Sequence, residues 1–168
     1  MAIRDGLLAE FEQEMAGTRR MLERITDEKF GWKPHEKSMA MGTLAGHVAG
    51  APGWTPRILK QAFVNVTAET RAAATASVPK NREQVLSQFD TNVADAKAVL
   101  AETSDETFAL PWSFQLDGKV QLTMPRGAVF RLFVMSHLIH HRGQLSVYLR
   151  LNNIPVPAMY GDSADEGR

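Results

Sequence analysis

Three of the five histidines in this chain of 168 residues fall within five positions, in the stretch "SHLIHHRGQLSVYL" that covers residues 136–149. His137 and His141 are four residues apart, so on an α-helix they are neighbours on one face. Two imidazoles at this spacing can bind one metal ion together, as they do in zinc-binding helices. The stretch therefore predicts a metal site on a helix.

The residues around this pair indicate the direction in which the imidazoles point. On a helical wheel with about 100° per residue, the pair shares its direction with mostly apolar side chains, so both rings are expected on the inward side of the helix. His140 falls at the flank of that side. The side chains within about 60° of the pair are Phe133, Val134, Gln144, Leu145 and Tyr148.

A third histidine, His47, lies with Trp54 on the apolar side of an earlier predicted helix. Three inward histidines from two helices match the open tetrahedral site of zinc enzymes, whose fourth position is left to water or substrate. The alternative is a buried polar cluster, but several core imidazoles would need several buried hydrogen-bond partners. We therefore predict that His47, His137 and His141 are the metal ligands, and that His140 is not one.

Other polar residues are weaker candidates for the same site. Gln144 and Tyr148 share the inward face of the last helix, where they would orient the substrate or a ligand imidazole, or would be hydrogen-bonded core residues. The acidic tail residues Asp162, Asp165 and Glu166 would support the ligands or would be a solvated acidic terminus. No further catalytic group is assigned.

Composition excludes several classes of function. Lys and Arg together number 19, as do Asp and Glu, so the chain has no basic field for nucleic acid. Cysteine is absent, so a metal must be held by nitrogen and oxygen atoms. No apolar run approaches the roughly 20 residues of a membrane span, and the acidic N-terminal segment does not resemble a signal peptide. We expect a cytoplasmic protein without a membrane or nucleic-acid partner.

Apolar spacing predicts a long first helix over residues 3–27, with apolar positions three and four residues apart. The second predicted helix has Ser38 as its N-cap, and Pro52 and Pro56 should kink or interrupt it just beyond His47.

The second half of the chain contains two further predicted helices. A polar loop with partial helix is expected over residues 64–80. The third helix begins at Asn81, whose side chain is a typical N-cap with Gln84 three residues later. The fourth helix has Pro125 in its first turn and runs to about Leu151.

Alternating apolar residues on both sides of the Asp117-Gly118 pair predict a β-hairpin before the last helix. A three-residue loop over 117–119 is preferred, because it pairs Phe114 with Leu122. The predicted fold is all-α: an antiparallel four-helix bundle with this small hairpin, formed by a single domain over residues 1–168. Bundle cores are common places for metal sites.

The last helix also has an apolar side that faces away from the histidines. Leu132, Met135 and Ile139 lie there, with Gly143 and Ser146 nearby. One interpretation is a homodimer that buries this stripe against its own copy. The alternative is that the hairpin or the long polar loop covers it.

The motifs together resemble those of the DinB (DinB/YfiT-like) superfamily of proposed metalloenzymes. The resemblance rests on "HLIHHRGQLSVYLR" followed by "VPAMYGDSADE", on "LAGHVAG" in the second helix, and on a Gly-Trp-Lys-Pro segment after the first. It implies a four-helix bundle, often dimeric, with zinc, nickel or iron on three histidines that map onto His47, His137 and His141. Some relatives use low-molecular-weight thiols such as mycothiol or bacillithiol in transfer or isomerisation.

These residues are consistent with three functions. The first is a divalent-metal-dependent enzyme, of transferase or hydrolase type, that acts on a small molecule with either a metal-bound water or a low-molecular-weight thiol as the nucleophile. The second is a metal-binding stress or sensor protein without turnover, and the third is a helical dimerisation module with structural histidines. A substrate-sized cavity beside the histidines would favour the first over the second.

Overall fold

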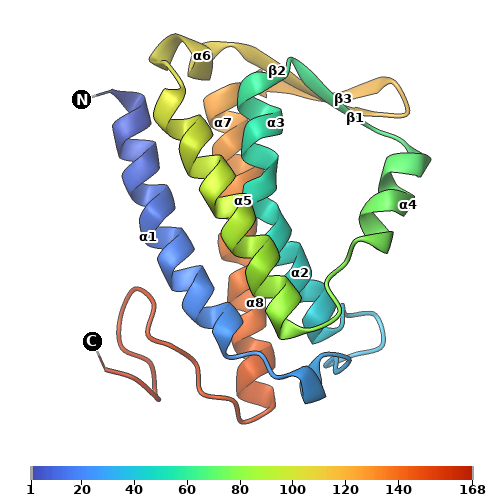
Figure 1. Ribbon diagram of the computed structural model, residues 1–168, viewed down its shortest axis with the longest axis vertical. Coiled ribbons are helices and arrows are strands. Elements are labelled where there is room, and N and C mark those ends of the chain that lie inside the picture. Colours follow the sequence, from blue (N-terminus) through green and yellow to red (C-terminus); the bar gives the residue numbers. More distant parts are fainter. Residues whose placement is uncertain (1, 168) are drawn as a thin grey trace.

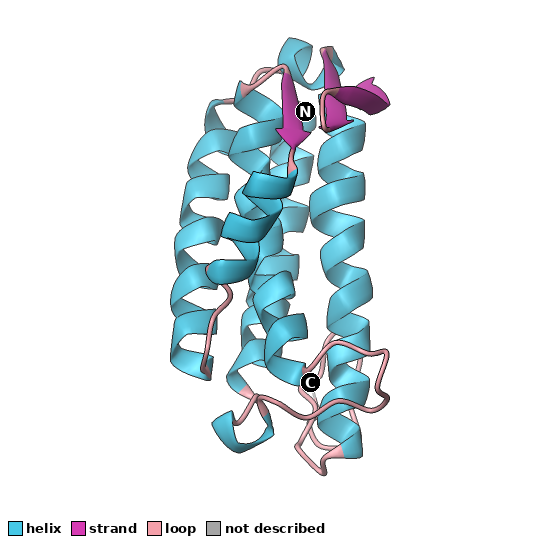
Figure 2. Cartoon of the chain, turned by 90° about the vertical axis from the view of Figure 1, so that its right-hand side faces the viewer, coloured by secondary structure: helices cyan, strands magenta, loops and turns pink. Residues whose placement is uncertain are grey.

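Helices lying side by side make up most of the chain, and a small sheet covers one end of them (Figures 1 and 2). The computed structural model describes residues 2–167. The longest helices are α1 (Ile3–Glu23), α2 (Met41–Gly50), α5 (Arg82–Glu102) and α8 (His137–Leu151). Helices α1 and α2 each pack against both α5 and α8. The expectation of a mostly helical fold with a small β element is correct.

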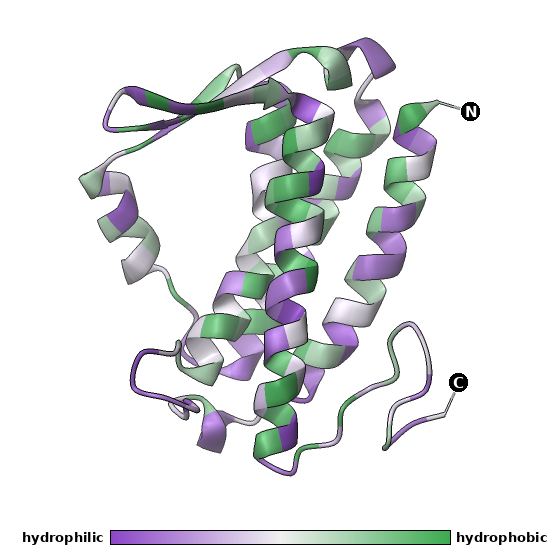
Figure 3. Cartoon of the chain, turned by 180° about the vertical axis from the view of Figure 1, so that it is seen from behind, coloured by the Kyte–Doolittle hydropathy of each residue, from purple (hydrophilic) through white to green (hydrophobic). Residues whose placement is uncertain are grey.

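Each long helix carries both hydrophobic and hydrophilic residues, as Figure 3 shows. The hydrophobic side forms one core that all the long helices share. Trp112 and Phe130 are among its largest fully buried side chains. No helix in the described part of the chain is both long and apolar enough to cross a membrane.

The first helix ends at Glu23, four residues before the end of the predicted range, and a short 3-10 turn, η1 (Asp27–Lys29), begins at the last residue of that range. Ser38 is not the N-cap of the second helix, because α2 begins after Ala40 without a capping side chain. Its first N–H groups instead donate to loop carbonyls: Met41 N to Trp32 O and Gly42 N to Phe30 O, each at 2.8 Å. The preceding loop therefore does the work of a cap.

Proline interrupts the second helical segment as predicted. Helix α2 gives way to a 3-10 turn, η2 (Ala51–Trp54), and then to α3 (Thr55–Lys60). Pro52 and Pro56 each lie in the first turn of one of these pieces, where the missing N–H costs nothing. The predicted start of α5 is also confirmed, since the Asn81 side chain accepts a hydrogen bond from Gln84 N.

The predicted hairpin is present as β2 (Pro111–Leu116) and β3 (Lys119–Pro125), with Phe114 opposite Leu122. The predicted length of its loop, three residues, is wrong. Leu116 pairs with Lys119 across a two-residue turn, in which both Asp117 (φ 47°) and Gly118 (φ 78°) have positive φ, and a β-bulge beyond Phe114 restores the register.

A third strand extends this hairpin. Strand β1 (Phe63–Val66) pairs in parallel with β2, so the sheet is mixed, with the order β1-β2-β3. Helix α4 (Ala68–Ala76) follows it and stands apart from the long helices (Figure 1). Both elements replace most of the polar loop expected over residues 64–80.

The fourth helical segment is not uniform. After Pro125 it consists of α7 (Arg126–Phe130), a π-helical turn η3 (Arg131–Ser136) and α8, which ends at Leu151 as predicted. A π turn accommodates an extra residue, so side chains on either side of it do not follow the constant rotation assumed for an α-helix. As a result Met135, predicted on the outer stripe, is 2% exposed in the core of this chain.

Part of the outer stripe lies against the chain's own C-terminal segment, whereas Leu132 stays 46% exposed. Ile139, Gly143 and Ser146 line a groove of about 400 Å³, whose other wall includes residues 156–163. Neither the hairpin nor α4 lies at this groove, so both coverings considered for the stripe were wrong. The homodimer stays a prediction, but a continuous apolar stripe no longer supports it, because Met135 is buried and Ile139 lies at the groove beside the tail.

A buried ion pair fastens this C-terminal segment. Arg142 and Glu14 lie 2.7 Å apart with nearly all of both side chains buried. The Arg142 guanidinium also donates to Glu14 O and to Thr18 Oγ1. The Tyr160 hydroxyl donates to the Glu14 carboxylate and accepts from Arg142. The cluster joins α1, α8 and the tail.

Replacing Arg142 by alanine should lower the free energy of unfolding by about 3 to 5 kcal/mol, because the Glu14 carboxylate would be left buried without its cation. Urea denaturation measures this loss. Arg150→Ala is the matched control on the same helix, since its partner Asp165 is exposed enough that the pair contributes about 1 kcal/mol or less. Equal losses in the two variants would contradict the role given to the buried pair.

Candidate metal centre

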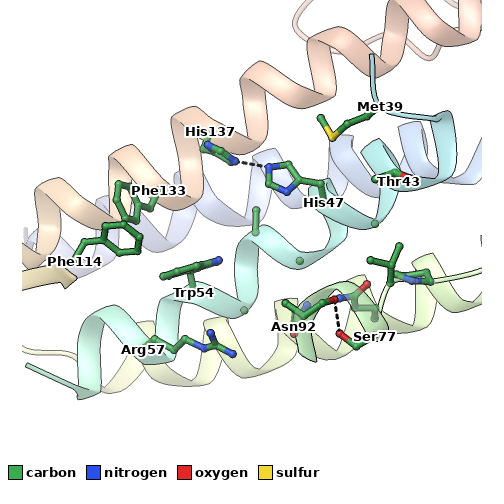
Figure 4. A pocket seen from close by; sticks show the side chains of 18 residues that line it. Met39, Thr43, His47, Trp54, Arg57, Ser77, Asn92, Phe114, Phe133 and His137 are labelled. Carbon is green, nitrogen blue, oxygen red and sulfur yellow. Dashed lines mark hydrogen bonds between the residues drawn. The ribbon is translucent and has the colours of Figure 1, made fainter. Parts of the chain in front are cut away.

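The three histidines predicted as metal ligands come together where α2 contacts α8. Helix α2 supplies His47, the first residue of α8 is His137, and His141 follows one turn later. One nitrogen from each ring lies within 4.8 Å of the others, and the ring centroids are 4.5 to 4.8 Å apart. His47 Nε2 and His137 Nε2 are 2.6 Å apart (Figure 4). Contrary to the expectation of a site inside the core, the rings lie at its edge, where solvent reaches them.

Gln144 holds one of these rings in a defined orientation. Its Oε1 lies 2.8 Å from His141 Nδ1, and its Nε2 lies 3.1 Å from His140 Nε2. If the amide oxygen accepts from His141 Nδ1–H, the Nε2 lone pair of that ring is free for a metal. His140 is bound to the other end of the same amide and lies outside the group of three.

The protein environment favours the neutral form of two of the rings. Burial lowers the pKa of His137 to about 4, and the neighbouring His141, His47 and His140 add to the shift. Burial and the charge of His141 lower the pKa of His47. Neutral imidazole is the form that binds metal ions, so these two rings need not lose a proton to do so at neutral pH.

The donor set fits a divalent transition metal. Three imidazoles face one another, and in the described part of the chain no carboxylate joins their group. Nitrogen donors of this kind suit zinc, nickel or iron rather than magnesium or calcium, which prefer oxygen. Three protein ligands leave a coordination position open.

The acidic tail residues have other partners. Asp165 pairs with Arg150 and accepts from Val156 N, and these contacts lower the pKa of its carboxyl. Glu166 forms ion pairs with Arg24 and Arg20. Asp162 lines the groove beside the tail. Asp165 and Glu166 therefore fasten the tail, and none of the three acids belongs to the histidine group.

Tyr148 also lies outside the histidine group. Its side chain is buried, its hydroxyl donates to Met39 O at 3.2 Å, and its ring packs edge-on against Trp32. These contacts hold the segment that leads into α2. The structure thus gives Tyr148 a place in positioning the helix that carries His47.

A cavity of about 580 Å³ opens beside His47 and His137 (Figure 4). Trp54, Phe114 and Phe133 form an aromatic wall, with Trp54 and Phe114 each packed against Phe133. The remaining lining residues are Met39, Thr43, Gly46, Gly50, Ala51, Gly53, Arg57, Ala74, Ser77, Val78, Pro79, Gln88 and Asn92. The volume is that of a small-molecule site.

Glycines on α2 and η2 help to create this cavity. Gly46, Gly50 and Gly53 line it at spacings of four and three residues, so they share one side of the helical segment. A Cβ atom at Gly46 would lie 3.0 Å from Pro79 Cδ, and one at Gly53 would lie 2.9 Å from Asn92 Oδ1. The sequence interpretation missed the cavity, although the spacing of these glycines was a signal for it.

Comparison with known proteins gives a consistent picture. The model of the DinB family matches residues 3–167. The chain is 24% identical over 163 residues to the uncharacterized protein YrdA of Bacillus subtilis, a match that covers 96% of this chain and 90% of YrdA.

Two solved structures share the fold. A DinB-like protein from Bacillus cereus has a TM-score of 0.69 at 23% identity, covering 95% of this chain and 98% of that one. A mycothiol-dependent maleylpyruvate isomerase has a TM-score of 0.61 at 15% identity, covering 90% of this chain and 64% of that one. Because the family model spans nearly the whole sequence, this chain belongs to the DinB family.

Proposed function

We propose that this protein is a divalent-metal-dependent enzyme that acts on a small molecule in the cavity beside His47, His137 and His141. The observation that carries the proposal is the meeting of three imidazoles, two of which, His47 and His137, line a cavity of about 580 Å³. A site that only stored or sensed metal would need no such cavity. The Nε2 atoms of His47 and His137 face each other at 2.6 Å, as two ligands of one ion would.

We propose zinc or nickel as the resident ion, with iron as a further candidate. A divalent ion with an open position lowers the pKa of a bound water or thiol, so that the nucleophile is ionised at neutral pH. His47, His137 and His141 would hold the ion. Gln144 would keep His141 turned so that its Nε2 faces the other rings.

A low-molecular-weight thiol is the proposed nucleophile. The chain has no cysteine, so a sulfur nucleophile must enter from solution. The aromatic wall of the cavity can exclude water from an apolar part of the reactants. A structural neighbour is named as a mycothiol-dependent isomerase, which agrees with thiol-dependent transfer or isomerisation as the reaction class. The cytoplasmic location stays a prediction.

The first test is metal binding by protein without a histidine tag. We expect about one zinc or nickel ion per chain with an affinity better than micromolar, and a loss of about 100-fold or more in His141→Ala. His140→Ala is the matched control and should keep its affinity, because His140 lies outside the group of three. Calorimetric titration and elemental analysis measure both. Full metal occupancy in His141→Ala would show that this ring is not a ligand.

The role of Gln144 can be tested by the same titration. Gln144→Ala should weaken metal binding by about 10-fold to 100-fold, because His141 loses the acceptor that fixes its orientation. Gln144→Glu keeps an acceptor oxygen at that position and should restore most of the affinity. If both variants bind metal as tightly as the wild type, Gln144 does not position the ligand.

Enzymatic use of the cavity is tested with Gly50→Leu. A Cβ atom at this position has only Gln88 Nε2 within 4 Å, at 3.8 Å, so the helix can accept a side chain that then projects into the cavity. We expect metal affinity to be retained, while thiol-dependent turnover of electrophilic small molecules falls by about tenfold or more. The assay uses a panel of low-molecular-weight thiols with and without added zinc or nickel. Turnover by the wild type that ignores both metal and thiol would contradict the proposal.

A further inference from the structure

One cation faces the cavity away from the histidines. Arg57, on α3, lines the cavity, and among the described lining residues there is no aspartate, glutamate or lysine. Figure 4 shows its side chain extended beside Trp54, on the helical segment that also carries His47. The cavity therefore contains a permanent positive charge without a counter-charge in its wall.

Arg57 differs from most other arginines of the chain. Arg19, Arg131 and Arg142, for example, each pair with a carboxylate. The Arg57 guanidinium makes no ion pair or hydrogen bond with any described residue. Its contact is a cation–π interaction, in which Cζ lies 5.5 Å from the centroid of the Trp54 ring. Such a contact fixes the guanidinium but leaves its N–H donors free.

The backbone beneath Arg57 is held firmly. The fully buried Trp112 donates from its Nε1 to Arg57 O at 3.1 Å. A guanidinium with a fixed backbone and a stacked side chain loses less conformational entropy on binding an anion than a freely moving one. Arg57 is therefore prepared for an anionic ligand that the chain itself does not supply.

The distance between the two polar regions limits the shape of this ligand. Arg57 follows His47 by ten residues on a mostly helical segment, which corresponds to about 15 Å along its axis. Trp54 lies between them on this segment and packs against Phe133, so the intervening surface is aromatic. A ligand that reaches both ends must be elongated, with an apolar middle.

We propose that Arg57 is a carboxylate-binding residue, and that the substrate or thiol is an elongated molecule with a carboxylate at one end, an apolar middle and its reacting group at the histidines. This inference rests on the proposed function for the position of the reacting group. A single guanidinium matches the charge and the two oxygens of a carboxylate. A phosphate dianion would leave charge uncompensated, because no second cation lines this part of the cavity among the described residues.

Matched probes can test this on zinc-loaded protein. Mercaptooctanoate carries a thiol and a carboxylate at opposite ends of an eight-carbon chain. Mercaptooctanol has the same chain length and thiol, but a neutral hydroxyl group takes the place of the carboxylate. We expect the carboxylate to bind about tenfold more tightly than the alcohol, as a charge-assisted hydrogen bond would give. The three-carbon pair, mercaptopropionate and mercaptopropanol, is too short to reach from the histidines to Arg57, so any difference between its two members should be the same in Arg57→Gln.

Arg57→Gln should remove the preference for mercaptooctanoate and leave mercaptooctanol binding unchanged. Lys60→Gln is the control on the same helix, because Lys60 lies outside the cavity lining and pairs with Glu102. It should keep the preference. Calorimetric titration gives all of these affinities without a need for turnover.

Two sets of outcomes separate this inference from the proposed function. A preference for mercaptooctanoate that persists in Arg57→Gln, or a preference within the three-carbon pair that Arg57→Gln removes, would overturn the carboxylate site while leaving the metal site intact. Tighter binding of a matching eight-carbon thiol phosphonate would overturn the choice of carboxylate. Metal-free protein should still prefer octanoate to octanol through Arg57. If it does, while zinc strengthens the binding of neither mercaptooctanoate nor mercaptooctanol, the carboxylate site stands and the thiol-dependent function fails.

Discussion

The buried ion pair between Arg142 and Glu14 is the constraint on which the arrangement of α8 depends. Removing two charges from water is costly unless they meet in good geometry, so this pair cannot be relocated by a small rotation of the helix. Arg142 follows His141 directly and therefore points about 100° away from it around the helix. With Arg142 fixed against α1, His141 is turned to the side of α8 that α2 approaches. Both members of the pair also form hydrogen bonds with the Tyr160 hydroxyl, so the position of the tail depends on the rotation of the helix.

The histidine group was predictable because α8 is regular from its first residue. His137 and His141 belong to one uninterrupted α-helix, so the wheel gave their relative direction correctly. The same wheel placed Met135 on the outer face, although the structure buries it in the core. Met135 lies in the π turn η3, where the rotation per residue is no longer constant. A proline in the sequence predicts a break in a helix, but no residue type in this stretch predicts a π turn as clearly. Such turns are frequent at functional sites, and this one ends where the first ligand of α8 begins.

The features that sequence reasoning missed are those that depend on distant parts of the chain. Turn residues specified the hairpin, but the parallel partner of β2 comes from Phe63–Val66, nearly fifty residues earlier. Local alternation cannot reveal such a pairing. The cavity is also non-local, because its walls come from α2, η2, α3, α5, β2, η3, the start of α8, and α4 with the segment that follows it. A space between elements has no sequence pattern of its own, and only the glycines on one wall pointed to it.

The cavity divides into a rigid part and a lightly packed part. The histidines and the aromatic wall lie on helices and a strand that share the main core, so their positions are fixed by many buried neighbours. The opposite wall includes Ala74, Ser77 and Val78 at the end of α4, a helix whose described side chains are all exposed. Changes in α4 would therefore remove little buried apolar contact and should cost little stability. The chemistry of the site is thus tied to the core, whereas the shape of the cavity can change through α4 without unfolding the chain.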